Sequence, residues 1–417
     1  MANLFPYLPE ELVEIIISRL PADSLVRFKC VNKAWYSYIC ARINDPLFVA
    51  KNLHYAKKKP SESLLLTRAS ASLLVTRNIS ASALSHIHAK SLLTSVLIDD
   101  DDDGDNNDHI IRCVTEDLSV PLRWSQWLVA YHCDGIICLL KDVYGTEIVL
   151  CNPILREYKR LPESNNNAKS FGKFRFAPVA MGFGYDSVAS DYKFVRVSFG
   201  QVKAEVYSLS TECWRQVKMR KNLILDSTVS DQFYNCLYFQ GACYWTMLDP
   251  SLGKMIILCF DMCEEVFHIV PFPKVAYYSS LVVWNDSVAL FLSSQEAWNS
   301  KTTCLEMWVM DDYFDAAKGT AYSPLTKRLV LGPLVDFPLP LRFWKSSDEL
   351  LLEDGRDEKL LAYNLRTQKL RKVEVDGEIN FPYCSYVKSL VSVNGIRKIS
   401  TYYSRRSKRR RTTQLPK

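Results

Sequence analysis

Residues 8–39 read LPEELVEIIISRLPADSLVRFKCVNKAWYSYI and predict three short helices in succession. Pro9 suits the first position of a helix, because the N–H that proline lacks would have no partner there. Pro21 ends this helix, Asp23 or Ser24 can cap a second one, and Asn32 can cap a third. Apolar residues recur every three or four positions and give the first helix one apolar face: Leu12, Ile15, Ile16 and Leu20.

A three-helix piece of about 40 residues is too small to bury all of its apolar surface. Its apolar side chains therefore need a partner, either the rest of this chain or another protein. The residues that we expect to make this contact are Leu8, Pro9, Leu12, Ile16, Leu20, Leu25, Val31 and Trp35.

The order of residues in this stretch resembles the F-box. The matching pieces are Leu-Pro-x-Glu-Leu, Arg-Leu-Pro, Ser-Leu-x-Arg-Phe and Val-x-Lys-x-Trp, all within 32 residues. The resemblance implies binding to a Skp-type adaptor and, through it, to the cullin and RING protein of a ubiquitin ligase. The eight apolar residues named above would then form the adaptor-binding face.

The composition of the 417-residue chain is that of a globular protein, with 48% hydrophobic and 24% charged residues. The longest uncharged apolar runs, such as 255–260, are far shorter than the roughly 20 residues that span a bilayer. The first residues lack the basic and apolar regions of a signal peptide. We therefore expect a cytoplasmic protein without a membrane partner, whose 13 cysteines are reduced and mostly buried.

The positive charge of the chain is concentrated in its last residues. Seven basic and no acidic residues lie in 404–417, which takes the formal charge from +6 for the chain to −1 for the remainder. The run Arg405 to Arg411 resembles a nuclear localisation or polyanion-binding patch, and the alternative is a solvated disordered end. If the tail directs nuclear import, the nucleus is the alternative location to the cytoplasm.

Short apolar strands recur at a regular interval between about residues 130 and 375. Five comparable strands end near Asn152, Leu209, Asp261, Met310 and Asn364, at intervals of 57, 52, 49 and 54 residues. A period near 50 built from short strands is typical of kelch-like β-propeller blades. A sixth unit would combine strands from 64–98 with strands from 385–399, which predicts about six blades. A two-sheet β-sandwich is the alternative.

These patterns predict an α+β multidomain protein in four parts. The parts are a three-helix F-box at 1–50, a junction at 51–62, an all-β propeller domain at 63–400 and a basic disordered tail at 401–417. The acidic run at 99–108 reads as a loop, because its spacing does not match a calcium-binding loop.

Three further segments resemble the F-box-associated interaction domain of plant F-box proteins. They are Cys151-Asn152-Pro153-Ile154 with Leu161-Pro162, then Gly182-Phe183-Gly184-Tyr185-Asp186 with Asp191-Tyr192-Lys193, and Phe343-Trp344-Lys345-Ser346 with Glu349-Leu350-Leu351. Residues 339–372 are similar to the S-locus F-box proteins of ribonuclease-based self-incompatibility. The resemblance implies a substrate receptor that marks a target protein for ubiquitination and degradation, with non-self S-locus ribonuclease in pollen as the finer expectation.

The sequence offers no catalytic motif, so we expect a non-catalytic adaptor without metal or cofactor. There is no Gly-x-Ser-x-Gly, no phosphate-binding Gly-rich loop with lysine, and no His-Glu-x-x-His. The pairs Cys133/Cys138 and Cys259/Cys263 lack the spacing of zinc ligands. His132 and Cys133 are adjacent in a strand and would point to opposite faces.

Substrate recognition is expected in loops on one face of the propeller, because loops tolerate variation while strands hold the scaffold. The candidate loops are 165–174, 294–303 and 311–322. Asp311, Asp312 and Asp315 would attract the basic ribonucleases that the family resemblance implies. The alternative function is a nuclear nucleic-acid-associated scaffold that acts through the basic tail; nucleic acid is otherwise not expected as a partner.

Overall fold

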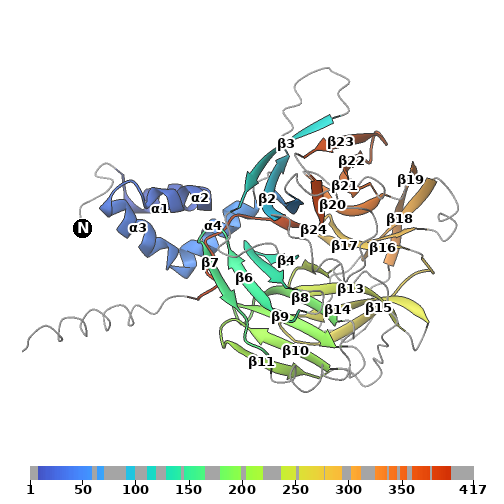
Figure 1. Cartoon of the computed structure of the whole chain (residues 1–417), viewed down its shortest axis with the longest axis horizontal. Coiled ribbons are helices and arrows are strands. Elements are labelled where there is room, and N and C mark those ends of the chain that lie inside the picture. The colour runs from blue at the N-terminus through green and yellow to red at the C-terminus, as the bar shows by residue number, and fades with distance from the viewer. Residues whose placement is uncertain are drawn as a thin grey trace, which may run out of the picture.

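The computed structural model contains four N-terminal helices and a β-propeller (Figure 1). It describes residues 8–58, 63–69, 91–98, 110–118, 128–141, 145–164, 179–198, 203–218, 236–249, 253–276, 278–293, 302–310, 325–335, 338–344, 348–354, 359–375 and 378–395. The acidic run at 99–108 and the basic tail at 401–417 lie outside these residues. Among the described helices, none is long and apolar enough to cross a membrane.

The helices are α1 (Glu10–Ser18), α2 (Ala22–Phe28), α3 (Lys33–Ile43) and α4 (Pro46–Lys57). The predicted Asn32 cap is confirmed, because its side chain accepts hydrogen bonds from the backbone N–H groups of Ala34 and Trp35. Pro9 directly precedes α1 rather than occupying its first position, and α2 begins at Ala22 after Pro21, so the predicted cap by Asp23 or Ser24 is wrong. The expectation of three helices is wrong, because α4 occupies most of the segment predicted to be a junction. Asp45 caps α4 and Pro46 is its first residue, a start signal that the sequence already carried.

Four of the five sheets in the described residues are antiparallel blades of four consecutive strands. Blade 1 contains β4 (Leu128–Cys133), β5 (Ile136–Leu140), β6 (Ile148–Asn152) and β7 (Glu157–Arg160). Blade 2 contains β8 (Val179–Asp186), β9 (Asp191–Ser198), β10 (Lys203–Ser208) and β11 (Cys213–Val217). Blade 3 contains β12 (Cys236–Phe239), β13 (Ala242–Asp249), β14 (Lys254–Asp261) and β15 (Phe267–Pro271). Blade 4 contains β16 (Ser279–Trp284), β17 (Ser287–Ser293), β18 (Thr302–Met310) and β19 (Leu325–Val335).

The fifth sheet has eight strands in the order β20-β21-β22-β23-β3-β2-β1-β24. Its strands are β20 (Leu339–Trp344), β21 (Glu349–Glu353), β22 (Leu360–Asn364), β23 (Leu370–Glu374), β1 (Ser63–Ala69), β2 (Ser91–Ile98), β3 (Ile110–Asp117) and β24 (Glu378–Tyr386). Counted as continuous sheets, the described residues form five blades, so the expectation of about six is wrong. The reason is the parallel pairing of β23 with β3, which joins two four-stranded halves into one sheet.

The predicted blade spacing is confirmed. Each of the five marker residues ends, or directly follows, the third strand of a four-strand unit: β6, β10, β14, β18 and β22. The half-sheet of β1, β2 and β3 takes its fourth strand from the C-terminal region, as predicted for a sixth unit. That strand is β24, which ends at Tyr386, whereas the prediction placed it within 385–399. It pairs with β1, so strands from the two ends of the propeller sequence lie side by side and close the ring.

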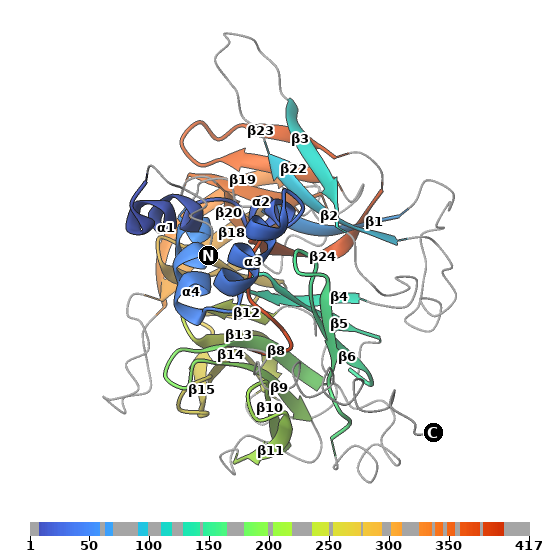
Figure 2. The ribbon, with the colours of Figure 1, turned by 90° about the vertical axis from the view of Figure 1, so that its left-hand side faces the viewer.

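Strand direction gives the propeller two different ends. We call the end that carries the β4–β5, β6–β7, β8–β9 and β10–β11 turns the turn end, and the opposite end the loop end. The helices lie over the turn end, as the two views in Figures 1 and 2 agree. The apolar core of the helices includes Val13, Ile17, Leu25 and Phe48 and also takes in Leu390, which follows β24. The helices and the propeller therefore share one core.

Candidate functional site

The helices expose an apolar face that no described part of the chain covers. Five large side chains on or beside α1 and after α2 are 36–59% exposed: Leu8, Leu12, Ile15, Ile16 and Val31. Val13 and Ile17, their neighbours on α1, are 3% exposed and lie in the core. Helix α1 thus has two apolar faces, one of which packs inward while the other faces solvent. We call the five exposed residues the open face.

The structure separates the predicted adaptor-binding residues into three groups. Leu8, Pro9, Leu12, Ile16 and Val31 are exposed, and all but Pro9 belong to the open face. Leu20 and Trp35 are half-buried and pack against the helical core, where the Trp35 and Phe28 ring centroids are 5.1 Å apart. Leu25 was predicted to contact the adaptor, but it is completely buried and belongs to the helical core. Ile15 and Tyr36, 36% and 56% exposed, were not among the predicted residues.

Polar contacts fix α1 against the other helices. Arg42 of α3 reaches Glu10 at 3.3 Å and Glu14 at 3.5 Å, and Lys51 of α4 reaches Glu14 at 3.6 Å. The buried Asn52 amide donates to the backbone oxygens of Ser18 at 2.9 Å and Leu20 at 2.8 Å, which satisfies carbonyls at the end of α1. These contacts hold the open face in one orientation relative to α4.

Helix α4 is in turn tied to the propeller through Asp134 in the β4–β5 turn. The Asp134 carboxylate lies 2.5 Å from the Lys57 ammonium of α4 and accepts a 3.1 Å hydrogen bond from the Tyr192 hydroxyl of blade 2. Its backbone oxygen accepts a hydrogen bond from the Ser389 hydroxyl at 2.5 Å. One turn thus joins the helices, two blades and the segment after β24.

The Cys-Asn-Pro motif has a similar structural role. The buried Asn152 amide donates to the backbone oxygens of Ser389 at 3.0 Å and Val391 at 2.8 Å. The same side chain accepts a hydrogen bond from the Ile154 N–H at 2.9 Å, which caps the β6–β7 turn. Asn152 therefore holds the C-terminal segment, and Leu390 within it, against the helical core.

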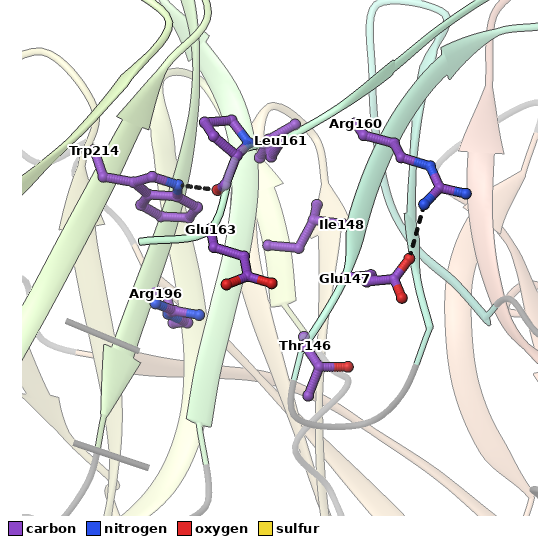
Figure 3. A pocket seen from close by; sticks show the side chains of 10 residues that line it. Thr146, Glu147, Ile148, Arg160, Leu161, Glu163, Arg196 and Trp214 are labelled. Carbon is purple, nitrogen blue, oxygen red and sulfur yellow. Dashed lines mark hydrogen bonds and ion pairs between the residues drawn. The ribbon is translucent and has the colours of Figure 1, made fainter. Parts of the chain in front are cut away.

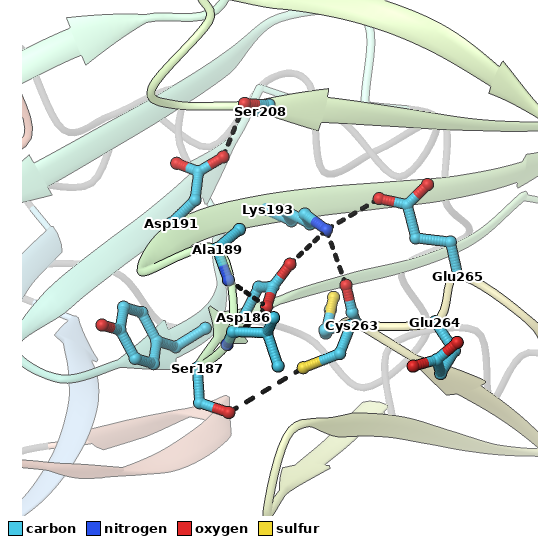
Figure 4. A network of polar contacts seen from close by, with 12 residues as sticks. Asp186, Ser187, Ala189, Asp191, Lys193, Ser208, Cys263, Glu264 and Glu265 are labelled. Atoms are coloured by element: carbon cyan, nitrogen blue, oxygen red, sulfur yellow. Dashed lines mark hydrogen bonds and ion pairs between the residues drawn. The ribbon is translucent and has the colours of Figure 1, made fainter. Parts of the chain in front are cut away.

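The second motif connects blade 2 to blade 3 through Lys193 (Figure 4). The Lys193 ammonium contacts Asp186 at 2.5 Å, Glu265 at 2.7 Å and the backbone oxygen of Met262 at 2.7 Å. Its side chain is 6% exposed, and the Arg215 guanidinium pairs with Glu265 from the outer side. The ammonium group helps hold the pKa of Asp186 below its ordinary value despite the opposing effect of burial.

The glycines of this motif permit the close approach of blade 3. A Cβ atom on Gly182 would lie 2.6 Å from the Cys243 sulfur, and one on Gly184 would lie 2.2 Å from the Tyr238 ring. Both distances are far shorter than a van der Waals contact, so only glycine fits at this interface. These motif residues pack blade 2 against blade 3.

The predicted substrate loops lie almost wholly outside the described residues, namely 165–174, 294–301 and 311–322. Of the predicted loop 294–303, only Thr302 and Thr303 are described, and they begin β18. Recognition through loops on one face therefore stays a prediction. Asp311, Asp312 and Asp315 lie outside the described residues.

A cavity of about 310 Å³ opens between blades 1 and 2 at the loop end (Figure 3). Its lining residues come from the start of β6, from the end of β7 and beyond, and from β9 and β11: Gly145, Thr146, Glu147, Ile148, Arg160, Leu161, Pro162, Glu163, Arg196 and Trp214. The predicted binding residues did not include any of these. Glu147 and Arg160 face each other across its mouth, 3.2 Å apart.

Of the cysteine and histidine residues weighed as possible sites, Cys133, Cys138 and Cys259 are buried in the core, His132 packs against Tyr386, and Cys263 is half-buried. Burial raises the pKa of the Cys133 and Cys138 thiols well above the ordinary value, and it raises the pKa of Cys151 to about 12. Burial lowers the pKa of His132 to about 4, and its ring packs edge-on against Tyr386 with centroids 5.3 Å apart. Among the described residues there is no group of three side chains arranged to hold a metal ion.

Comparison with known proteins identifies both parts of the chain. Residues 97–393 match the F-box associated beta propeller domain, and residues 5–45 match the F-box domain. The chain belongs to the family of proteins with the F-box associated beta propeller domain. It is 27% identical over 403 residues to the F-box/kelch-repeat protein At3g23880 of Arabidopsis thaliana, covering 93% of this chain and 96% of that protein.

A second relative is the F-box protein CPR1 of Arabidopsis thaliana, 24% identical over 389 residues, covering 88% of this chain and 84% of that protein. Among solved structures, a chain from the crystal structure of a nidogen/laminin complex aligns with a TM-score of 0.44 and 10% identity, covering 79% of this chain and 99% of that chain. Both relatives are F-box proteins of a plant.

Proposed function

We propose that this chain is the substrate-recognition subunit of a Skp–cullin–F-box ubiquitin ligase, in which the open face binds the Skp-type adaptor. The observation that supports the proposal is the exposure of four apolar side chains of the F-box match, Leu8, Leu12, Ile16 and Val31, at 46–59%. Contiguous exposed apolar side chains on a folded domain are typical of a protein-binding surface. The chain contributes proximity, since it holds the target near a conjugating enzyme bound elsewhere in the complex.

Replacement of Leu8, Pro9 and Leu12 by alanine tests this proposal. We expect the full-length variant to lose co-purification with a Skp-type adaptor, because all three side chains are exposed and contribute little to the helical core. Circular dichroism of the same sample would check that the strands are retained. Unchanged adaptor binding by the folded variant would exclude the open face as the binding surface.

The finer proposal concerns the target protein. The similarity of residues 339–372 to S-locus F-box proteins supports a non-self S-locus ribonuclease as substrate, with Asp311, Asp312 and Asp315 as charge partners. Replacing these three residues by asparagine should weaken capture of ribonucleases from style extract, and more so at low salt than at high salt. Equal capture by the intact protein and the variant would remove the acidic residues from the proposal, and capture of unrelated proteins alone would exclude this substrate.

A further inference from the structure

The cavity between blades 1 and 2 contains one charged side chain that lacks a described partner of opposite charge. Four of its lining residues are charged: Glu147, Arg160, Glu163 and Arg196. Glu147 pairs with Arg160 at 3.2 Å and also with Lys141, so both of its oxygens are engaged. Glu163 makes no ion pair or side-chain hydrogen bond to any residue in the described part of the chain.

The charge of Arg196 is neutralised from behind the cavity wall. Its guanidinium lies 2.7 Å from the Glu205 carboxylate, and the two side chains are 3% and 8% exposed. The guanidinium also lies over the Trp214 ring, whose centroid is 5.1 Å away. Arg196 is thus held in a buried pair rather than presented to a ligand.

Figure 3 shows the Glu163 carboxylate in the middle of the lining residues, between Arg196 of blade 2 and Ile148 of blade 1. Apolar side chains also line the cavity, namely Ile148, Leu161 and the Trp214 indole. Trp214 is fixed by a 2.6 Å hydrogen bond from its indole N–H to the backbone oxygen of Pro162. An apolar wall that ends at an open carboxylate suits a long side chain with a cationic tip.

We propose that this cavity binds a lysine or arginine side chain of a protein ligand, with Glu163 as the counter-charge. The inference rests on the proposed function, because it names a feature of the substrate that the propeller receives. The volume of about 310 Å³ lies at the lower limit for ligand pockets and fits one long side chain better than a larger molecule. The cavity opens at the loop end, away from the helices, so a bound ligand and a bound adaptor would not compete.

The test uses the full-length chain co-purified with a Skp-type adaptor and four blocked nine-residue Gly/Ser peptides. The peptides carry Lys, Arg, Gln or Glu at the centre, and their affinities are compared by NMR titration at low salt. We expect the Lys and Arg peptides to bind about tenfold more tightly than the Gln peptide, as for a charge-assisted hydrogen bond. Equal affinities for the intact chain, or tightest binding of the Glu peptide, would overturn the proposal.

Variants of Glu163 make the assignment specific. Glu163→Gln should remove the preference for basic peptides, and Glu163→Lys should shift it toward the Glu peptide. The matched control is Glu264→Gln, which changes an exposed glutamate in the β14–β15 turn of blade 3, outside the cavity. A basic preference that survives in Glu163→Gln contradicts the proposal. Adaptor co-purification in the same samples reports on the proposed function separately, because it depends on the helices alone.

Discussion

The F-box helices and the propeller blades place apolar and charged side chains in opposite ways. The helices expose Leu12 and Ile16 to solvent, where charge would favour solubility. Blade 2 buries Lys193 and Arg196, where apolar side chains would pack at lower cost. Each buried charge has its counter-charge within 2.7 Å, whereas the exposed apolar side chains are not covered by the described chain. The difference teaches that charges buried in the blades are paired within the fold, whereas the uncovered apolar face is the surface that we propose for adaptor binding.

The largest effect should come from breaking the buried charge cluster. Lys193→Met would leave Asp186 and Glu265 without their shared ammonium, and we expect a loss of about 4 kcal/mol in the free energy of unfolding. Denaturation by urea, followed by tryptophan fluorescence, would measure it. Arg215→Met is the matched control, because Arg215 contacts the same Glu265 but is 46% exposed. That variant should lose less than about 1 kcal/mol, and equal losses would contradict the distinction.

The next largest loss of stability should follow a substitution on the buried face of the helices. Leu25→Ala removes a side chain that is 0% exposed, and we expect the helices to lose about 3 kcal/mol of stability. Hydrogen exchange of the α1–α3 amides would report the loss, with Leu12→Ala as the control on the open face. If Leu12→Ala raised exchange as much as Leu25→Ala, the two faces of the helices would not differ as described.

Acid should weaken the packing of blade 1 against β24 through His132, whose ring contacts Tyr386. The folded chain holds the pKa of His132 at about 4 because the ring is buried, whereas the ordinary value is 6.5. The unfolded chain therefore binds more protons between these values, and stability falls as pH drops below 6.5 and levels off below 4. We expect a loss of about 2 kcal/mol between pH 6.5 and 5.

Urea midpoints across this range would measure the acid effect, above the pH at which most carboxylates titrate. His132→Gln should flatten the dependence, since the replacement carries no titrating group. The exposed His54 of α4 provides the comparison. The interpretation fails if His54→Gln flattens the curve and His132→Gln leaves it unchanged.

Local sequence patterns predicted most helices and strands. The arrangement of strands into sheets was harder to predict, because it depends on pairing between segments that are far apart in the sequence. Proline positions placed the limits of α1 and α2 to within a few residues, the Asn32 cap placed α3, and strand spacing placed the third strand of five units. The union of β23 with β3 rests on three residue pairs between segments more than 250 residues apart, which periodicity does not reveal. The start of α4 was different, because Asp45 and Pro46 carry a local helix-start signal although no helix was predicted there.

Residue types in the sequence indicated which part of the chain forms the candidate adaptor-binding face. They did not indicate which of its apolar side chains are exposed and which are buried. Leu12 and Leu25 look equivalent in the sequence, since each is a leucine in an amphipathic helix of the F-box. Only the packing of α1 to α4 with Leu390 shows that one is exposed and the other buried. The cavity beside Glu163 is lined by residues of both blade 1 and blade 2, an arrangement that no local motif marks.

A charged residue introduced on the open face should change stability least of all these substitutions. It should nevertheless abolish adaptor binding. Ile16 is 51% exposed, so Ile16→Lys should alter the free energy of unfolding by no more than about 0.5 kcal/mol. Adaptor binding should nevertheless be lost, because a lysine at the centre of an apolar contact would be buried without a partner. Size-exclusion chromatography with the adaptor would measure binding, and urea denaturation would measure stability. The neighbouring variant Ile17→Lys should instead unfold the helices, since Ile17 is 3% exposed and faces the core. If Ile16→Lys still bound the adaptor at full affinity, the open face would need another partner, and the contrast between uncovered apolar and paired charged residues would no longer identify the site.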